Sequence, residues 1–156
     1  MANTHYLKQV VEPHVVGWLS RRAGILFHPA LLAVGPRADG TEAHFAFDGV
    51  SADQRAAVLV STSLTVKSGG TRKLHVDASI LLQTPLDRRV MVFISEDVRR
   101  HFANTCDGLL PLSRIEMLVC DDLPDEMRRQ IALIQAEAKA EVGDRGRIRK
   151  PGGRRR

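Results

Sequence analysis

The sequence of 156 residues is poor in aromatic side chains, which make up 4% of it and include one tryptophan and one tyrosine. Its core must therefore be built mainly from valine, leucine, isoleucine and alanine. The two cysteines, Cys106 and Cys120, form no CxxC pair, and the histidines show no ligand spacing with them. These patterns argue against a disulfide framework and a zinc site.

Long apolar runs are also missing. No stretch approaches the roughly 18 apolar residues that a membrane span needs, and the first residues contain no long apolar segment of the signal-peptide type. The sequence therefore predicts a cytoplasmic protein in a reducing environment, with no membrane partner.

Basic residues are concentrated at the C-terminal end. Residues 144–156 contain seven bases and one acid, a net charge of +6, and the whole chain carries +5, which leaves −1 for residues 1–143. Residues 1–143 are predicted to form a single α/β domain. The basic tail lacks apolar periodicity, which predicts disorder. It is expected to bind nucleic-acid phosphates without sequence readout, although such tails are equally typical of solubility segments. The candidate contacts are Arg145, Arg147, Arg149 and Lys150.

Hydrophobic periodicity predicts a regular order of helices and strands. Helices are expected over residues 4–22, 71–84, 96–106 and 124–143, and strands over residues 30–35, 43–48, 57–63, 89–95 and 114–120. The first three strands are close enough for a meander, and helices between the later strands favour parallel crossovers. The order α-β-β-β-α-β-α-β-α predicts an α/β fold with a mixed β-sheet flanked by helices.

A hairpin over residues 43–63 is expected at the centre of the sheet. Its first arm alternates apolar and polar positions, which indicates one buried face. Its second arm, residues 57–63, begins as a continuous apolar run and turns polar at its end, and such a run is typical of a strand covered on both faces. Asp48 is expected to end the first arm, ahead of Gly49 and a polar loop. A carboxylate there is typical either of a catalytic site or of a turn in which Asp binds the following backbone.

The order helix–strand–strand–strand–helix–strand over about residues 4–95 resembles the core of the PD-(D/E)XK nuclease superfamily, the restriction-endonuclease-like fold. In that family an Asp ends the second core strand, an Asp/Glu-x-Lys triplet lies on the third, and a Glu on the first helix sometimes completes the metal site. The resemblance assigns Asp48 to the first motif and Glu12 to the helix carboxylate. It implies that both are ligands of Mg²⁺ in a metal-dependent nuclease.

The third predicted strand departs from the family pattern. The hairpin register places the triplet near Leu59-Val60-Ser61, where there is neither a carboxylate nor a lysine. Lys73, early in the next predicted helix, is the candidate to supply the missing amine. Asp77 lies one turn further and is the candidate carboxylate. On the resemblance, the candidate catalytic residues are Asp48 and Lys73.

Two classes of function remain open. One is a nuclease-like, nucleic-acid-associated domain that is catalytically degenerate because its second metal carboxylate is missing, with Mg²⁺ as cofactor only if it is active. The basic residues Lys67 and Arg72, beside the hairpin, are its further candidate nucleic-acid contacts. The other class is a non-enzymatic module that binds a protein partner. The near-neutral charge of residues 1–143 favours this second class, because a DNA-binding cleft is normally basic.

Overall fold

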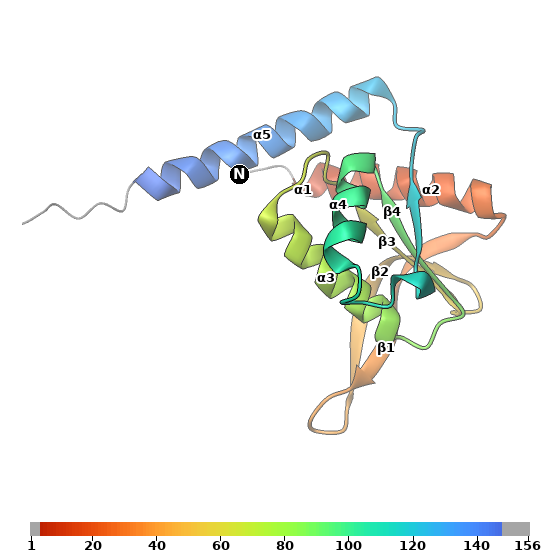
Figure 1. Ribbon diagram of the computed structural model, residues 1–156. Helices are drawn as coiled ribbons and strands as arrows, with labels where there is room; N and C mark the ends of the chain where they lie inside the picture. Colours follow the sequence, from red (N-terminus) through yellow and green to blue (C-terminus); the bar gives the residue numbers. More distant parts are fainter. Residues whose placement is uncertain (1–3, 148–156) are drawn as a thin grey trace, which may run out of the picture.

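The computed structural model describes residues 4–147 and the side chains of residues 4–143. This part of the chain forms a five-stranded mixed sheet with helices on both faces (Figure 1). The helices are α1 (Thr4–Tyr6), α2 (Glu12–Ala23), α3 (Ser68–Gln83), α4 (Glu96–Cys106) and α5 (Asp125–Arg147), with a π-helical turn η1 (Leu7–Val11) and a 3-10 turn η2 (Leu112–Arg114). The strands are β1 (Phe27–Pro36), β2 (Glu42–Ser51), β3 (Ala56–Ser61), β4 (Arg88–Phe93) and β5 (Glu116–Val119). The predicted order of elements is confirmed.

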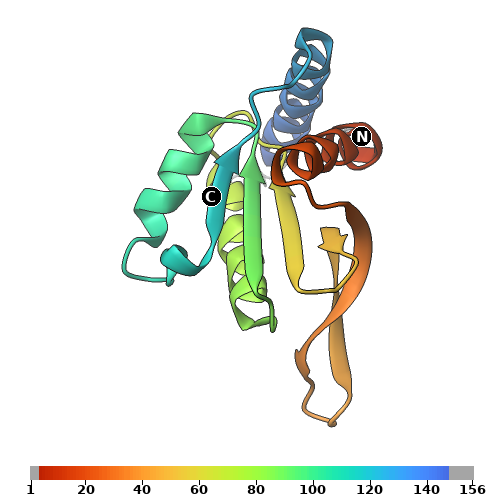
Figure 2. The same ribbon diagram turned by 90° about the vertical axis from the view of Figure 1, so that its right-hand side faces the viewer.

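The strands lie in chain order across the sheet, as Figure 2 shows. β1 pairs with β2 and β2 with β3 in antiparallel fashion, whereas β3, β4 and β5 are parallel. The predicted meander and the parallel crossovers are therefore both confirmed. Every residue of the central strand β3 is buried, as its apolar run predicted.

The pairing between β2 and β3 is shorter than predicted. Only two positions pair, Gly49 with Val58 and Val50 with Ala57. The earlier part of β2 pairs with β1 instead, and these two strands leave the sheet together as a long hairpin that projects from the body (Figures 1 and 2). The prediction that Asp48 ends its strand is wrong, because β2 continues to Ser51. Asp48 lies at the point where β2 and β3 separate.

An apolar core lies on each face of the sheet. On one face, α2 and the beginning of α5 pack against β3 and β4, with Val15, Leu19 and Ile131 fully buried. On the other face, α3 and α4 cover the sheet, with Leu81 and Phe102 fully buried. Each such side chain stabilises the fold by about 1.5–3 kcal/mol. The two cores hold α2 and α3 on opposite faces of the strand pair that carries Asp48.

The first helical segment is irregular just before Pro13. The π-helical turn η1 ends at Val11, and Pro13 occupies the first turn of α2. The N–H of Glu12 bonds to the carbonyl of Leu7, five residues back, so the wider turn ends directly before the residue that has no N–H to donate. α2 ends at Ala23, and its C-cap residue Gly24 has a left-handed φ of 65°, which suits glycine.

Two helix boundaries differ from those predicted. α3 begins at Ser68, three residues earlier than expected, so the Ser-Gly-Gly segment is its first turn rather than a loop. α5 continues to Arg147, beyond the predicted end at Gly143. Residues 148–156 of the predicted disordered tail lie outside the described residues. No helix in the described part of the chain is both long enough and apolar enough to cross a membrane.

Gly49 permits the close approach of α2 and β1 to β2. A Cβ atom at this position would lie 3.0 Å from Phe27 Cβ and 3.2 Å from Val16 Cγ1. We expect Gly49→Ala to destabilise the protein by about 1–3 kcal/mol, because neither neighbour can move without disturbing the core. Gly69→Ala, in α3 with open space around it, is the matched control. Urea unfolding that shows equal effects for the two variants would contradict this interpretation of Gly49.

Candidate functional site

Where β2 and β3 separate, the side chain of Asp48 accepts a hydrogen bond that a backbone carbonyl would otherwise accept. Its Oδ2 accepts a hydrogen bond of 2.7 Å from the backbone N–H of Val60 on β3. One further step of the β2–β3 register would place Leu59 opposite Asp48, but the strands have already separated there. An unpaired N–H in this half-buried place would destabilise the sheet. The carboxylate therefore has a structural role whether or not it has a chemical one.

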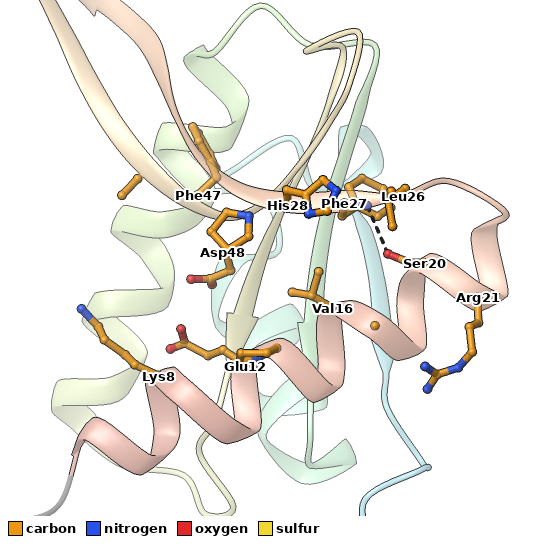
Figure 3. A pocket seen from close by; sticks show the side chains of 14 residues that line it. Lys8, Glu12, Val16, Ser20, Arg21, Leu26, Phe27, His28, Phe47 and Asp48 are labelled. Carbon is orange, nitrogen blue, oxygen red and sulfur yellow. Dashed lines mark hydrogen bonds between the residues drawn. The ribbon is translucent and has the colours of Figure 1, made fainter.

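Glu12, in the first turn of α2, lies against Asp48. Figure 3 shows the two carboxyl groups pointing toward one another. Burial, the negative charge of Asp48 and a hydrogen bond to Asp48 raise the pKa of Glu12 from 4.5 to about 7. Burial also raises the pKa of Asp48, against the opposing effect of the Val60 N–H. Two carboxyl groups this close cannot both ionise readily, so they share a proton that Glu12 holds near neutral pH.

Three further charged groups surround this pair. Lys8, one turn before Glu12, lowers the pKa of Glu12 through its positive charge, and Lys73 on α3 lowers the pKa of both carboxyl groups. Lys73 Nζ lies 2.8 Å from Oδ2 of Asp77, and that buried carboxylate raises the pKa of Asp48. The structure thus brings Asp48, Glu12 and Lys73 into one electrostatically coupled group, with Asp77 as a fourth member.

A cleft of about 610 Å³ opens beside the carboxyl pair, between α2 and the β1–β2 hairpin (Figure 3). Lys8, Glu12 and Asp48 lie at one end of it and Arg21 at the other. Its walls between these ends are largely apolar and come from α2, β1 and β2. Such a cleft suits a partly apolar ligand better than a bare polyanion.

The donor set at Asp48 does not fit Mg²⁺ as it stands. That ion requires near-octahedral oxygen coordination and gives up its waters reluctantly. Glu12, with its pKa raised to about 7, is only partly ionised near neutral pH, Asp77 is paired with Lys73, and Leu59 contributes no oxygen. Within residues 4–143 no three His, Cys, Asp or Glu side chains are grouped so as to hold a metal ion. The chemistry this arrangement can perform by itself is to hold and release a proton.

Two of the basic residues predicted to contact nucleic acid, Lys67 and Arg72, have described side chains, and neither lines this cleft. Lys67 is the N-cap residue of α3, and Arg72 lines a different hollow between α3 and α4. Arg145 and Arg147 belong to the part of α5 whose side chains are not described. Arg149 and Lys150 lie outside the described residues.

Two features of this region were not predicted from the sequence. Lys8 precedes Glu12 by four residues, and this helical spacing was a usable signal. The second is a contact of 3.1 Å between Cys106 Sγ on α4 and His75 Nε2 on α3. No sequence motif indicates it, because the two residues are brought together only when α3 and α4 pack side by side.

Comparison of this chain with protein-family models, with curated proteins and with solved structures finds no match.

Proposed function

We propose that the chain is a nuclease-like domain with the restriction-endonuclease-like fold, which binds nucleic acid but has lost metal-dependent cleavage. The observation that carries this proposal is the position of Asp48. It lies where β2 and β3 separate and faces a carboxylate from the first helix, while the apolar Leu59 occupies the neighbouring position on β3.

The arrangement around Asp48 supports the fold assignment. The order helix, three antiparallel strands, helix and parallel strand is the order on which the resemblance rests. Glu12 and Lys73 reach Asp48 from helices on opposite faces of the sheet. This convergence is what a phosphodiester-cleaving site of that family needs, apart from the missing carboxylate on β3.

The state of the charged groups supports the loss of cleavage. A lysine that neutralises charge on a scissile phosphate must be free to reach it, but Lys73 is paired with Asp77. A carboxyl group that keeps its proton near neutral pH is a poor ligand for a hard divalent cation. The pair consequently lacks the full negative charge that a metal-binding nuclease site requires.

The expected result of a cleavage assay is therefore negative. We expect the purified protein to bind labelled single- and double-stranded DNA and RNA in fluorescence anisotropy, with an affinity that falls as salt rises. With Mg²⁺ or Mn²⁺ present, the same substrates should remain intact on gels for wild type, Asp48→Ala and Lys73→Ala.

Cleavage by the wild type that disappears in both Asp48→Ala and Lys73→Ala would show a rewired, active site and would overturn the proposed loss of function. Glu42→Gln, which removes an exposed carboxylate at the start of β2, controls for general effects of removing a charge. Absence of any nucleic-acid binding by the full chain would sink the nucleic-acid part of the proposal.

A non-enzymatic interaction module is the second candidate. The cleft beside Glu12 favours it, because its walls are largely apolar and Leu26 at its rim is 65% exposed. β1 forms the edge of the sheet, and an exposed strand edge can accept an extended peptide. Protein binding that Leu26→Asp abolishes, in a chain that fails to bind nucleic acid, would decide for this class.

A further inference from the structure

A second hollow, of about 620 Å³, lies between α3 and α4, which run side by side in Figure 1. Neither Glu12 nor Asp48 lines it. The residues around it are Ser68, Thr71, Arg72, His75, Val76 and His101. None of them carries a carboxylate, and all but the valine carry a polar hydrogen. This composition contrasts with that of the cleft beside Asp48, which contains two carboxyl groups.

The cationic and polar groups at this hollow are not neutralised by neighbours. Among the residues that the structure describes, Arg72 makes no ion pair, and the side chains of His101 and Ser68 have no hydrogen-bond partner. On the neighbouring helix α4, the carboxylate of Glu96 pairs with Arg99 and Arg100 and not with the groups at the hollow. Asp97 precedes His101 by one helical turn but does not line the hollow. Unpaired donors around a concave surface are the normal setting of an anion site.

His75 is oriented by a buried partner. Cys106 is fully buried, its Sγ lies 3.1 Å from Nε2 of His75, and the ring of His75 packs edge-on against Phe102 at 6.0 Å. Burial raises the pKa of the Cys106 thiol, so a neutral thiol faces Nε2. Because Cys106 occupies Nε2, Nδ1 is the ring nitrogen left for a ligand. The contacts with Cys106 and Phe102 thus fix the position of the His75 ring before any ligand arrives.

We propose that this hollow binds a phosphate group, held by the guanidinium of Arg72, the imidazoles of His75 and His101 and the hydroxyl of Ser68. Arg72 supplies a planar fork of donors that matches phosphate geometry, and the imidazoles and the hydroxyl are further groups that can donate to phosphate oxygens. The site shares no residue with the Glu12–Asp48 pair, so it does not depend on the proposed loss of cleavage, although Arg72 is also one of the candidate nucleic-acid contacts. The phosphate can belong to a small phosphorylated molecule or to a nucleic acid, and the chemistry of recognition is the same for both.

The test is a titration of the full chain with inorganic phosphate at constant ionic strength, followed by NMR of the imidazole nitrogens. We expect saturable shifts at His75 and His101. Arg72→Gln should weaken binding about tenfold or more, as loss of a charge-assisted hydrogen bond does. Arg37→Gln removes the same charge from the exposed tip of the β1–β2 hairpin and should leave the affinity unchanged.

Two further probes distinguish the source of the phosphate. Phenyl phosphate that binds as tightly as a short 5′-phosphorylated oligonucleotide would support a small phosphorylated ligand. An oligonucleotide that binds more tightly and loses that advantage in Arg72→Gln would support nucleic acid. The proposal is overturned if phosphate leaves the His75 and His101 signals in place, or if Arg72→Gln and Arg37→Gln weaken binding equally.

Discussion

Replacing Glu12 by glutamine should stabilise the protein above pH 7 and have little effect near pH 4.5. The pKa of Glu12 rises from 4.5 to about 7 on folding, so the folded state holds this proton more tightly than the unfolded chain does. Its contribution to stability is complete below the unfolded value and is lost as pH rises through about 7. Glutamine keeps a donor toward Asp48 and does not ionise, so the variant should escape this loss.

The expected size of this effect is moderate. A rise of the pKa from 4.5 to about 7 corresponds to roughly 3 kcal/mol at full value. Because Glu12 is only half-buried, solvent screening reduces this to about 1–2 kcal/mol. Urea unfolding of wild type and Glu12→Gln near pH 4.5 and near pH 8 measures it, with Glu42→Gln as the exposed control. A stability difference that does not change between the two pH values would contradict the shared-proton description.

Local patterns in the sequence were enough to predict most of the helices and strands. Ser95 Oγ accepts a hydrogen bond from Val98 N at the start of α4, and Glu96 and Asp97 lie in the first turn, a helix-start pattern that is visible in the sequence. The buried β3 and the parallel strands that follow came from runs of apolar residues and the helices between them. These features depend on neighbours within a few residues, which a single sequence displays.

The pairing of β2 was not predictable in the same way. Residues 43–48 alternate as a half-buried strand should, but alternation does not identify the partner strand. β2 pairs mainly with β1, and the face carrying Phe45 and Phe47 packs toward α3. The separation of β2 from β3 follows from this long-range packing. The alternative that Asp48 binds backbone in a turn was correct in the type of interaction. The side chain does accept a hydrogen bond from backbone, but the donor lies on a neighbouring strand and not in a turn.

The candidate site was predicted in part. The resemblance selected Asp48, Glu12 and Lys73, and the structure places all three in one coupled group. The ion pair of Lys73 with Asp77 follows from their spacing of four residues on a helix. The shared proton of Glu12 could not be derived beforehand, because it depends on the burial and approach of two carboxyl groups on separate elements. The donor-lined hollow between α3 and α4 likewise depends on how the two helices pack.

The structural and chemical roles of Asp48 can be separated by comparing Asp48→Asn with Asp48→Ala. Asparagine keeps an oxygen that accepts from Val60 N–H and removes the negative charge. Alanine removes the acceptor as well. An N–H left without its partner in this half-buried place costs about 1–3 kcal/mol, so near pH 8 we expect Asp48→Ala to be less stable than Asp48→Asn by that amount. Both variants relieve the repulsion that raises the pKa of Glu12.

Amide hydrogen exchange at Val60 gives the local readout. Exchange should be slow in wild type and in Asp48→Asn, and faster in Asp48→Ala, because only the last lacks an oxygen to hold this N–H at the division between β2 and β3. If Val60 is equally protected in both variants, another acceptor satisfies it and the carboxylate is not needed for the sheet. The sheet would then not require a carboxylate at Asp48. The placement of this carboxylate beside Glu12 would favour a chemical role for the pair.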